Sequence, residues 1–413
     1  CYSSNAVCSP TRATFLTGLL PSQHGVHSWL AGGRLQMGPE ADSTIREFRS
    51  LPEILADEGY VCGLSGKWHL GDNLHPQEGF SFWVTKPHGA TASLYHSQVI
   101  ENGSVRRVES YATEYWTRRG VEFIKESKDR PFFLFLAYNG PYGHSPPMAH
   151  AAQNRHAAYY ADQPLTSFPR PKVHPWLIHD RKLVGNLEAL RSYAAEVSGV
   201  DDGVGRVLQT IEDLGLSQRT LVIFTADQGF ACGHGGFWGM GAHTRPLTAY
   251  DWTMHVPLIF RHPGRIPPGR KSDLLTSNYD LLPSLLAYLG LKDRTPDNPK
   301  GPGRDYSAVL AGREAPAWDD AVFYEYQNVR AIRTTEWKYV ERFRQEPNEL
   351  YHLADDPEEK TNLIDQPKPA EVQKELRRRL HAFFERYCDP QYDLWRGGES
   401  KSRLCPTRPA NAR

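Results

Sequence analysis

The highest concentration of reactive side chains lies in a segment that begins at Cys8 and reads Cys-Ser-Pro-Thr-Arg-Ala-Thr-Phe-Leu-Thr-Gly. A cysteine side chain can supply a nucleophile. Arg12 follows Cys8 by four residues, about one turn of a helix, so both side chains can face one site where the guanidinium would hold negative charge. Taken alone, Cys8 would more simply be a small buried residue ahead of a proline turn and a helix, and Arg12 a surface cation.

A second group lies in the segment Gly66-Lys67-Trp68-His69-Leu70-Gly71. Alternate residues of an extended stretch point to one side, so Lys67 and His69 can converge while Trp68 packs away from them. A cation about 4 Å from an anionic oxygen contributes roughly 4 kcal/mol at an effective dielectric constant near ~20. The pair therefore predicts an anion-binding site, although the side chains of an isolated Lys-x-His usually lie on the surface without a functional role.

A third group is Thr225-Ala226-Asp227-Gln228-Gly229. The carboxylate of Asp227 and the side-chain carbonyl of Gln228 are hard oxygen donors, which suit Ca²⁺ or Mg²⁺. A turn with a capping aspartate at the end of a strand explains the same residues without a metal.

The elements that position these groups are predicted from hydrophobic patterning to be strands and helices in alternation. Such alternation is typical of an α/β sheet covered by helices, in which ligands bind beyond the carboxyl ends of the strands. The candidate residues, including His144, follow the expected strands directly. Expected strands are 60–64, 131–137, 220–225 and 256–260, and expected helices are 50–58 and 190–214, the latter ended by Gly215.

Beyond a stretch rich in glycine, proline and charge at residues 301–317, the pattern changes. Residues 320–326 and 330–342 are predicted strands, 369–387 an amphipathic helix, and 396–413 a loosely packed tail. We expect a catalytic domain over residues 1–310 and a smaller α+β subdomain over residues 311–413.

Together these segments resemble the sulfatase family, and the resemblance runs from about Cys1 to Leu363. It implies an alkaline-phosphatase-like α/β fold with a large mixed, mostly parallel sheet flanked by helices. In the family, a cysteine in the position of Cys8 is oxidised to formylglycine. One hydroxyl of the hydrated aldehyde, activated by a metal, attacks sulfur, and the other then collapses to the aldehyde and expels sulfate.

The resemblance also assigns residues. It implies Cys8 as nucleophile stabilised by Arg12, Lys67 and His69 as sulfate binders, His69 also in proton transfer, and His144 as general acid or simply a loop histidine. Metal ligands would be Asp227, Gln228 and the modified Cys8, with Ca²⁺ expected and Mg²⁺ an alternative.

The sequence departs from the family pattern in three places. Family members carry a strand ending in an aspartate pair some tens of residues before the cysteine, and this sequence holds no such stretch, so we expect the chain to be N-terminally incomplete. Met240 stands where a sulfate-binding lysine is common, so His243 or, preferably, Arg245 is expected to supply the charge. The usual Pro-His after the strand expected at 131–137 reads Pro141-Tyr142-Gly143-His144.

Composition limits the partners. Lysine plus arginine equals aspartate plus glutamate at 48 each, which gives no general argument for a nucleic acid or an anionic membrane surface. No run of eighteen apolar residues occurs, so no membrane span is expected. None of the six cysteines forms a CxxC pair, and Cys388 and Cys405 could form a disulfide in an oxidising compartment.

The leading hypothesis is a sulfatase acting on a sulfated carbohydrate, matured by a formylglycine-generating enzyme and located in the periplasm or secreted. Two alternatives stay open: a phosphate or phosphonate monoester hydrolase on the same fold, and a catalytically impaired glycan-binding relative.

Overall fold

The computed structural model describes residues 1–31, 33–315, 317–343 and 347–402. Contacts divide the chain into two compact units. Unit 1 comprises Cys1–Trp29, Val222–Ala231 and Met240–Arg413, and unit 2 comprises Leu30–Leu221 and Cys232–Gly239. The division expected near residue 310 remains a prediction.

Unit 2 contains a five-stranded mixed sheet with the order β4-β3-β2-β1-β5. The central strand β1 runs parallel to β2 and β5, with Leu64 opposite Trp83 and Phe135, whereas β2, β3 and β4 pair antiparallel. Parallel neighbours end at the same edge, so residues that follow β1, β2 and β5 meet there. The strands are β1 (Val61–Gly66), β2 (Phe82–Thr85), β3 (Gln98–Glu101), β4 (Ser104–Arg107) and β5 (Phe132–Ala137).

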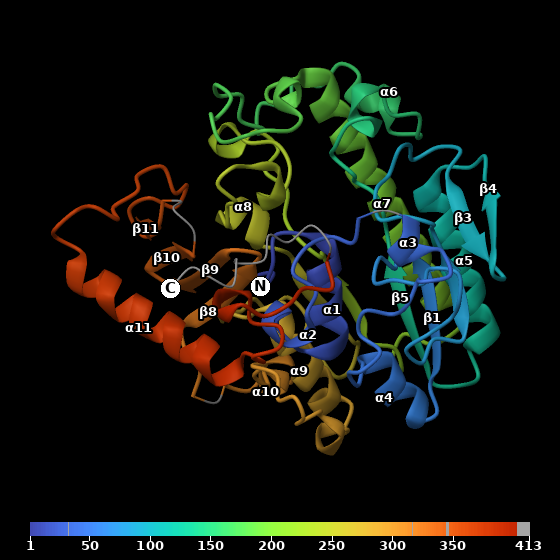
Figure 1. Cartoon of the computed structure of the whole chain (residues 1–413). Coiled ribbons are helices and arrows are strands. Elements are labelled where there is room, and N and C mark those ends of the chain that lie inside the picture. The colour runs from blue at the N-terminus through green and yellow to red at the C-terminus, as the bar shows by residue number, and fades with distance from the viewer. Residues whose placement is uncertain (32, 316, 344–346, 403–413) are drawn as a thin grey trace. The chain divides into compact units, whose positions relative to one another are not determined.

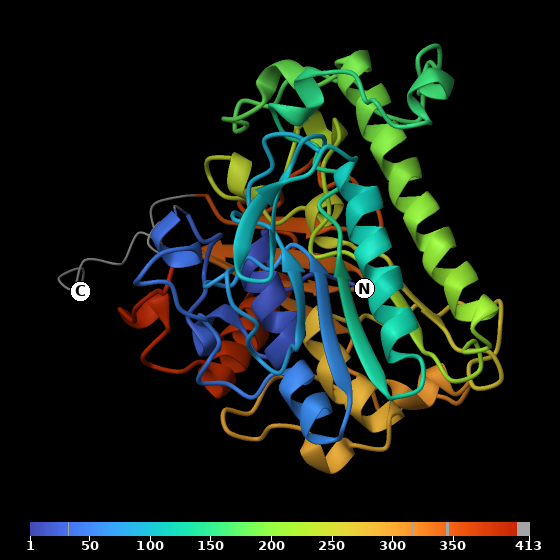
Figure 2. The ribbon, with the colours of Figure 1, turned by 90° about the vertical axis from the view of Figure 1, so that its right-hand side faces the viewer.

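The long helix α5 (Ala112–Ser127) packs on this sheet, and the longer α7 (Leu187–Asp213) packs against α5, so that the two helices run side by side (Figure 2). The side chain of Asn186 caps α7 by accepting a hydrogen bond from the Ala189 N–H, and Gly215 follows its end with a positive φ of 65°. The shorter elements of unit 2 are α3 (Gly33–Gln36), α4 (Leu51–Asp57), α6 (Ala157–Tyr160) and the 3₁₀ turns η1 (Pro147–Ala149), η2 (Arg181–Leu183) and η3 (His234–Gly236).

Unit 1 contains the antiparallel pair β6–β7 and an antiparallel four-stranded sheet with the order β11-β10-β9-β8, against which α11 packs (Figure 1). Leu376, Leu380 and Phe384 of α11 lie buried against this sheet. The elements are α1 (Cys8–Thr17), α2 (Pro21–His24), β6 (Val222–Thr225), η4 (Gly241–His243), α8 (Asp251–Met254), β7 (Leu258–Arg261), η5 (Asn278–Asp280), α9 (Leu281–Tyr288), η6 (Lys292–Arg294), α10 (Ser307–Leu310), β8 (Ala321–Tyr326), β9 (Val329–Thr334), β10 (Trp337–Arg342), β11 (Glu349–His352), α11 (Ala370–Tyr387) and η7 (Leu394–Arg396).

The α/β fold class and the helices expected at 50–58, 190–214 and 369–387 are confirmed, with ends that shift by at most three residues. The single strand expected over 330–342 is wrong. The chain reverses at Thr335 and Glu336, so this stretch forms the hairpin β9–β10, and neither residue is a glycine or proline that would have marked the turn.

Among the described residues, no helix is both long and apolar enough to cross a membrane. Cys405 lies outside the described residues, so its pairing with Cys388 stays a prediction, as does the structure of the tail beyond residue 402.

Candidate active site

Cys8 is the first residue of α1, and every residue of this helix is buried. Pro10 lies in the first turn, where its missing N–H removes a donor that would lack an intrahelical partner. The segment before the helix is held by Asn5, whose side-chain oxygen accepts the Val7 N–H. Gly18 ends the helix in the left-handed conformation, with its N–H donating to the Thr14 carbonyl. The motif thus places Cys8 at a fixed helix start, 6% exposed.

Arg12 pairs with Asp227, which follows β6 in the same unit. Its Nε and Nη2 donate to Asp227 Oδ2 at 3.0 and 2.8 Å, and the two side chains are 6% and 20% exposed. Ser3 Oγ also donates to the Asp227 backbone carbonyl at 2.9 Å, which ties the strand end to the segment before α1. Two of the residues expected together from sequence, Arg12 and Asp227, are therefore in direct contact.

Gln228 supplies the second oxygen donor that the sequence predicts. Its Oε1 is buried and has no hydrogen-bond partner among the described residues, while its backbone N–H donates to Asp227 Oδ1. A buried carbonyl oxygen without a donor is costly unless a ligand satisfies it. The carboxylate of Asp227 and this amide oxygen are the donor types that Ca²⁺ and Mg²⁺ prefer, so these two residues fit such an ion in kind.

Lys67 lies at the carboxyl end of β1 in unit 2, where its N–H donates to the Ala137 carbonyl at 2.8 Å. The preceding Gly66 has a φ of 119°, and a Cβ there would meet the Ala137 oxygen at 2.0 Å, so the position requires glycine. The Lys67 ammonium is 5.9 Å from the centre of the Tyr142 ring, and the residue as a whole is only 5% exposed. Tyr142 occupies the place where the family resemblance implies a histidine.

His69 is 3% exposed and adopts a positive φ of 64°. Its Nε2 lies 3.0 Å from the Leu30 carbonyl, and its ring packs against Gly89, where a Cβ would meet the ring at 2.0 Å. Trp68 points into the core as expected: it is fully buried, and its Nε1 donates to the Gly71 carbonyl.

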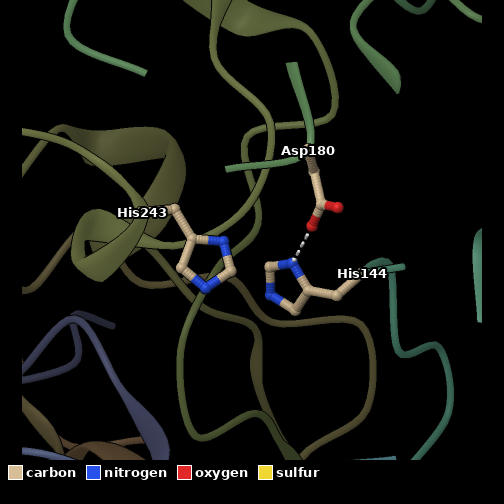
Figure 3. Close-up of side chains that lie close together, drawn as sticks. All are labelled: His144, Asp180 and His243. Atoms are coloured by element: carbon tan, nitrogen blue, oxygen red, sulfur yellow. Dashed lines mark hydrogen bonds and ion pairs between the residues drawn. The ribbon is translucent and has the colours of Figure 1, made fainter. Parts of the chain in front are cut away.

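His144 follows β5 and forms a pair with Asp180 (Figure 3). The distance from His144 Nδ1 to Asp180 Oδ2 is 3.1 Å, and the two side chains are 7% and 13% exposed. Burial lowers the pKa of His144, the hydrogen bond and charge of Asp180 oppose this, and the nearby Lys67 charge lowers it further. Trp238 Nε1 donates to the Gly143 carbonyl at 2.6 Å and so fixes the loop that carries His144.

The residues expected to replace the missing lysine lie in unit 1. His243 ends the short helix η4 and is half-buried, whereas Arg245 is exposed and its Nη1 donates to the carbonyls of Ala242 and Thr244. Their contribution to substrate binding remains a prediction.

Asp180 is the residue that the sequence interpretation missed. It lies 36 residues after His144 in a loop without hydrophobic periodicity, and no motif surrounds it. Its left-handed φ of 53° directly before η2 is a conformation that aspartate tolerates better than most residues, but such a position is visible only in the structure.

The profile of the sulfatase family matches residues 1–291. The chain belongs to the sulfatase family. A second profile, that of the N-sulphoglucosamine sulphohydrolase C-terminal region, matches residues 245–386 and thus includes the four-stranded sheet and α11.

Two relatives show how the chain compares with other sulfatases. It is 29% identical over 375 residues to N-acetylgalactosamine-6-sulfatase of Canis lupus familiaris. This alignment covers 83% of this chain but only 63% of the dog protein. It is 23% identical over 481 residues to N-acetylglucosamine-6-O-sulfatase of Bacteroides thetaiotaomicron, covering 95% and 80% of the two chains.

Solved structures confirm the fold. A putative sulfatase from Bacteroides fragilis superposes with a TM-score of 0.77 at 23% identity, covering 94% of this chain and 87% of the other. A phosphonate monoester hydrolase from Silicibacter pomeroyi superposes with a TM-score of 0.70 at 20% identity, covering 95% and 88%. The sulfatase fold of this chain is therefore shared with enzymes named for two different ester chemistries.

Proposed function

We propose that this chain hydrolyses sulfate esters of a carbohydrate, with Cys8 converted to formylglycine as the nucleophile. The observation that carries the proposal is the ion pair of buried Arg12 with half-buried Asp227, with Arg12 one helical turn after Cys8, within the segment that matches the sulfatase profile. Burying a cation is costly even when a carboxylate pairs with it, which argues for a specific use.

The chemistry follows from the aldehyde. Its hydrate carries two hydroxyl groups on one carbon. One oxygen attacks sulfur, the S–O bond to the sugar breaks, and the sugar oxygen takes a proton and departs as an alcohol. The second hydroxyl then loses its proton, the C=O bond re-forms, and the C–O bond to sulfate breaks. A serine in the place of Cys8 would instead leave a sulfate ester that water has to cleave.

Asp227, Gln228 and the modified Cys8 would hold a Ca²⁺ or Mg²⁺ ion. Such an ion supplies Lewis-acid stabilisation of negative charge at the sulfate group. The relevant observation is the donor set, a carboxylate beside a buried amide oxygen that has no hydrogen-bond partner in the described residues.

The remaining residues would bind and protonate the substrate. Lys67 and His69 hold the sulfate group, and Arg245 or His243 adds charge in place of the lysine missing at Met240. His144 donates the proton to the leaving sugar oxygen, with Asp180 fixing its ring through the 3.1 Å contact with Nδ1. Asp180 acts here as a positioning residue.

A sulfated carbohydrate is the substrate class that the relatives favour, because both are named for sulfate on an N-acetylhexosamine. The proposal includes maturation by a formylglycine-generating enzyme and location in the periplasm or outside the cell.

The test is mass spectrometry of the tryptic peptide that ends at Arg12, after co-expression with a formylglycine-generating enzyme. We expect an aldehyde at Cys8, located by fragmentation because the peptide also contains Cys1. Sulfate release from a sulfated N-acetylhexosamine is then compared between wild type and Cys8→Ala. The proposal would be contradicted by an unmodified Cys8 thiol in cells that convert a control sulfatase, or by activity that survives Cys8→Ala.

The second candidate, a phosphate or phosphonate monoester hydrolase, is favoured by the likeness to the phosphonate monoester hydrolase fold. Comparing kcat/KM for sulfate, phosphate and phosphonate esters of one alcohol separates the two chemistries. Binding of glycans with no turnover of any ester by converted protein would instead support the third alternative, a glycan-binding relative.

A further inference from the structure

Unit 2 contains a hollow that none of the residues assigned above occupies. Its volume is about 230 Å³, and its walls come from the loop at residues 92–95, the segment 147–153 and the first turns of α7. This size is below the usual range of roughly 300 to 1,000 Å³ for drug-sized ligands, so it fits one ring rather than a chain of rings.

The hollow adjoins the loops that carry the sulfate-site residues of unit 2. Thr91, directly before its first wall residue, accepts hydrogen bonds from Lys86 Nζ at 2.8 Å and from the Asn139 side chain at 3.1 Å. On the other side, Met148 lines the hollow, and its N–H donates to the His144 carbonyl. One wall of the hollow therefore follows Thr91, which contacts residues one and two positions beyond the ends of β2 and β5. The other wall includes Met148, four residues after His144.

The floor of the hollow carries a buried carboxylate, that of Glu196 on α7, which is 1% exposed. Tyr111 donates a hydrogen bond to Glu196 Oε2, and Tyr95 donates to Oε1 at 3.2 Å. A carboxylate oxygen has two acceptor positions, so each oxygen keeps capacity for a further donor. Burial raises the pKa of Glu196 to about 6, so the group is mostly charged at neutral pH.

The remaining lining is partly polar, with His150 and Gln153, and partly apolar. No lysine or arginine contributes to it in the described part of the chain, and Met148 and Leu94 supply apolar surface. Ser192 donates its hydroxyl hydrogen to the His150 carbonyl at 3.0 Å, so its oxygen can only accept further hydrogen bonds. A lining that offers the acceptor oxygens of Glu196 and Ser192 but no lysine or arginine disfavours a sulfated or carboxylated sugar ring. It favours a ring that presents hydroxyl or amide donors.

We propose that this hollow is a subsite for an uncharged sugar ring adjacent to the sulfated one, with Glu196 accepting hydrogen bonds from its hydroxyl or amide groups. This inference rests on the proposed function, because it makes the substrate an oligosaccharide rather than a monosaccharide. A second hollow of about 340 Å³ shares Met148, His150 and Ala151 with the first and includes Lys182. The surface available to a glycan therefore continues beyond one ring.

The test uses a sulfated trisaccharide of N-acetylhexosamine, its desulfated form and a small aryl sulfate. Ala92→Trp fills the hollow from an exposed position, and Glu196→Gln removes the charged acceptor while keeping its size. Ala158→Trp, an exposed alanine on α6 outside both hollows, is the matched control. Circular dichroism confirms that each variant folds.

We expect Ala92→Trp and Glu196→Gln to weaken trisaccharide binding at least tenfold by calorimetry. We also expect them to lower the ratio of kcat/KM for the sulfated trisaccharide to that for the aryl sulfate by a similar factor, whereas Ala158→Trp changes neither quantity. Equal trisaccharide affinity in wild type and Ala92→Trp, or no measurable affinity in wild type, overturns the subsite. Trisaccharide binding that depends on the hollow without any sulfate release contradicts the proposed function and leaves the subsite standing.

Discussion

Asp227 and Glu196 are two carboxylates with different partners: one pairs with a cation, and the other accepts hydrogen bonds from neutral side chains. Asp227 in unit 1 pairs with the guanidinium of Arg12, and a divalent ion is the further partner we propose. Glu196 in unit 2 accepts hydrogen bonds from two phenols, and its pKa rises because burial opposes its charge. The first arrangement balances charge where a sulfate group is expected, and the second leaves charge unbalanced where hydroxyl donors are expected. Neutralising each carboxylate should therefore have different consequences.

The largest expected effect is that of Asp227→Asn on turnover. This change removes the charge that pairs with Arg12 and weakens the proposed metal site, so kcat/KM for a sulfate ester should fall at least roughly 10³-fold. Asp57→Asn, which alters an exposed ion pair with Arg49, is the control and should leave kcat/KM within a factor of two. A loss of less than tenfold in Asp227→Asn would contradict the assignment of Asp227 to the site.

Arg12→Ala tests the same pair from the other side. Removing the arginine leaves a half-buried carboxylate without its ion-pair partner, which should lower the free energy of unfolding by about 3 kcal/mol. Urea denaturation at pH 7 measures this value. Arg46→Ala breaks an exposed pair with Asp42 and should change it by no more than about 0.5 kcal/mol. Similar values for the two variants would show that burial adds nothing to the Arg12 pair.

Asp180→Asn should lower turnover of the natural ester by about tenfold to a hundredfold, because His144 loses the group that orients its ring. Asp180 also raises the pKa of His144, so any limb of the pH–rate profile that His144 causes should move to lower pH. Glu109→Gln, which alters an exposed pair with His96, should leave the profile in place. A lower rate with an unshifted profile would point to a structural effect alone.

On stability, Glu196→Gln should produce the smallest effect, which is a change in pH dependence rather than the loss of an ion pair. Because the pKa of Glu196 is raised from 4.5 to about 6, the folded protein binds its proton more tightly than the unfolded chain does, and the wild type loses roughly 2 kcal/mol of stability as pH rises through this window. The variant should lack this loss. Denaturation at pH 4.5 and pH 7 measures it, with exposed Glu188→Gln as the control. An unchanged pH dependence in Glu196→Gln would contradict the contrast with Asp227.

The sequence predicts elements well where its signals are local. The long helix α7 follows from apolar residues at helical spacing and from Gly215 at its end, and the burial of Trp68 follows from alternation next to β1. The packing of α7 is less predictable. Its buried face includes Gly199 and Gly203, because the Tyr111 and Tyr138 hydroxyls approach these two positions too closely for a Cβ. The apolar Val197, by contrast, is 45% exposed.

The hairpin β3–β4 shows a local signal that the patterning overlooked. Its turn is Asn102-Gly103, and both residues have positive φ, which is the preferred sequence for a two-residue hairpin turn. The edge of the sheet that carries this hairpin was therefore predictable from two residues.

Some residues of the candidate sites could likewise be predicted from local signals in the sequence, and others could not. Arg12 and Asp227 were assigned to one site from motifs, and the structure places them in contact. Asp180 and Glu196 were not assigned, because each meets its partners across long stretches of chain: 36 residues separate Asp180 from His144, and 101 separate Glu196 from Tyr95. Such contacts depend on how loops return to the sheet, which neither periodicity nor spacing encodes.

The walls of the smaller hollow have a consequence for protein engineering. Ala92, Ala151 and Ala152 line it. Because Ala92 and Ala151 are exposed, larger side chains at these two positions disturb no core packing. Gly66 and Gly89, by contrast, tolerate no side chain at all without moving β5 or the His69 ring. A combinatorial library that randomises the three alanines while holding both glycines constant would vary glycan preference independently of the bond-breaking machinery.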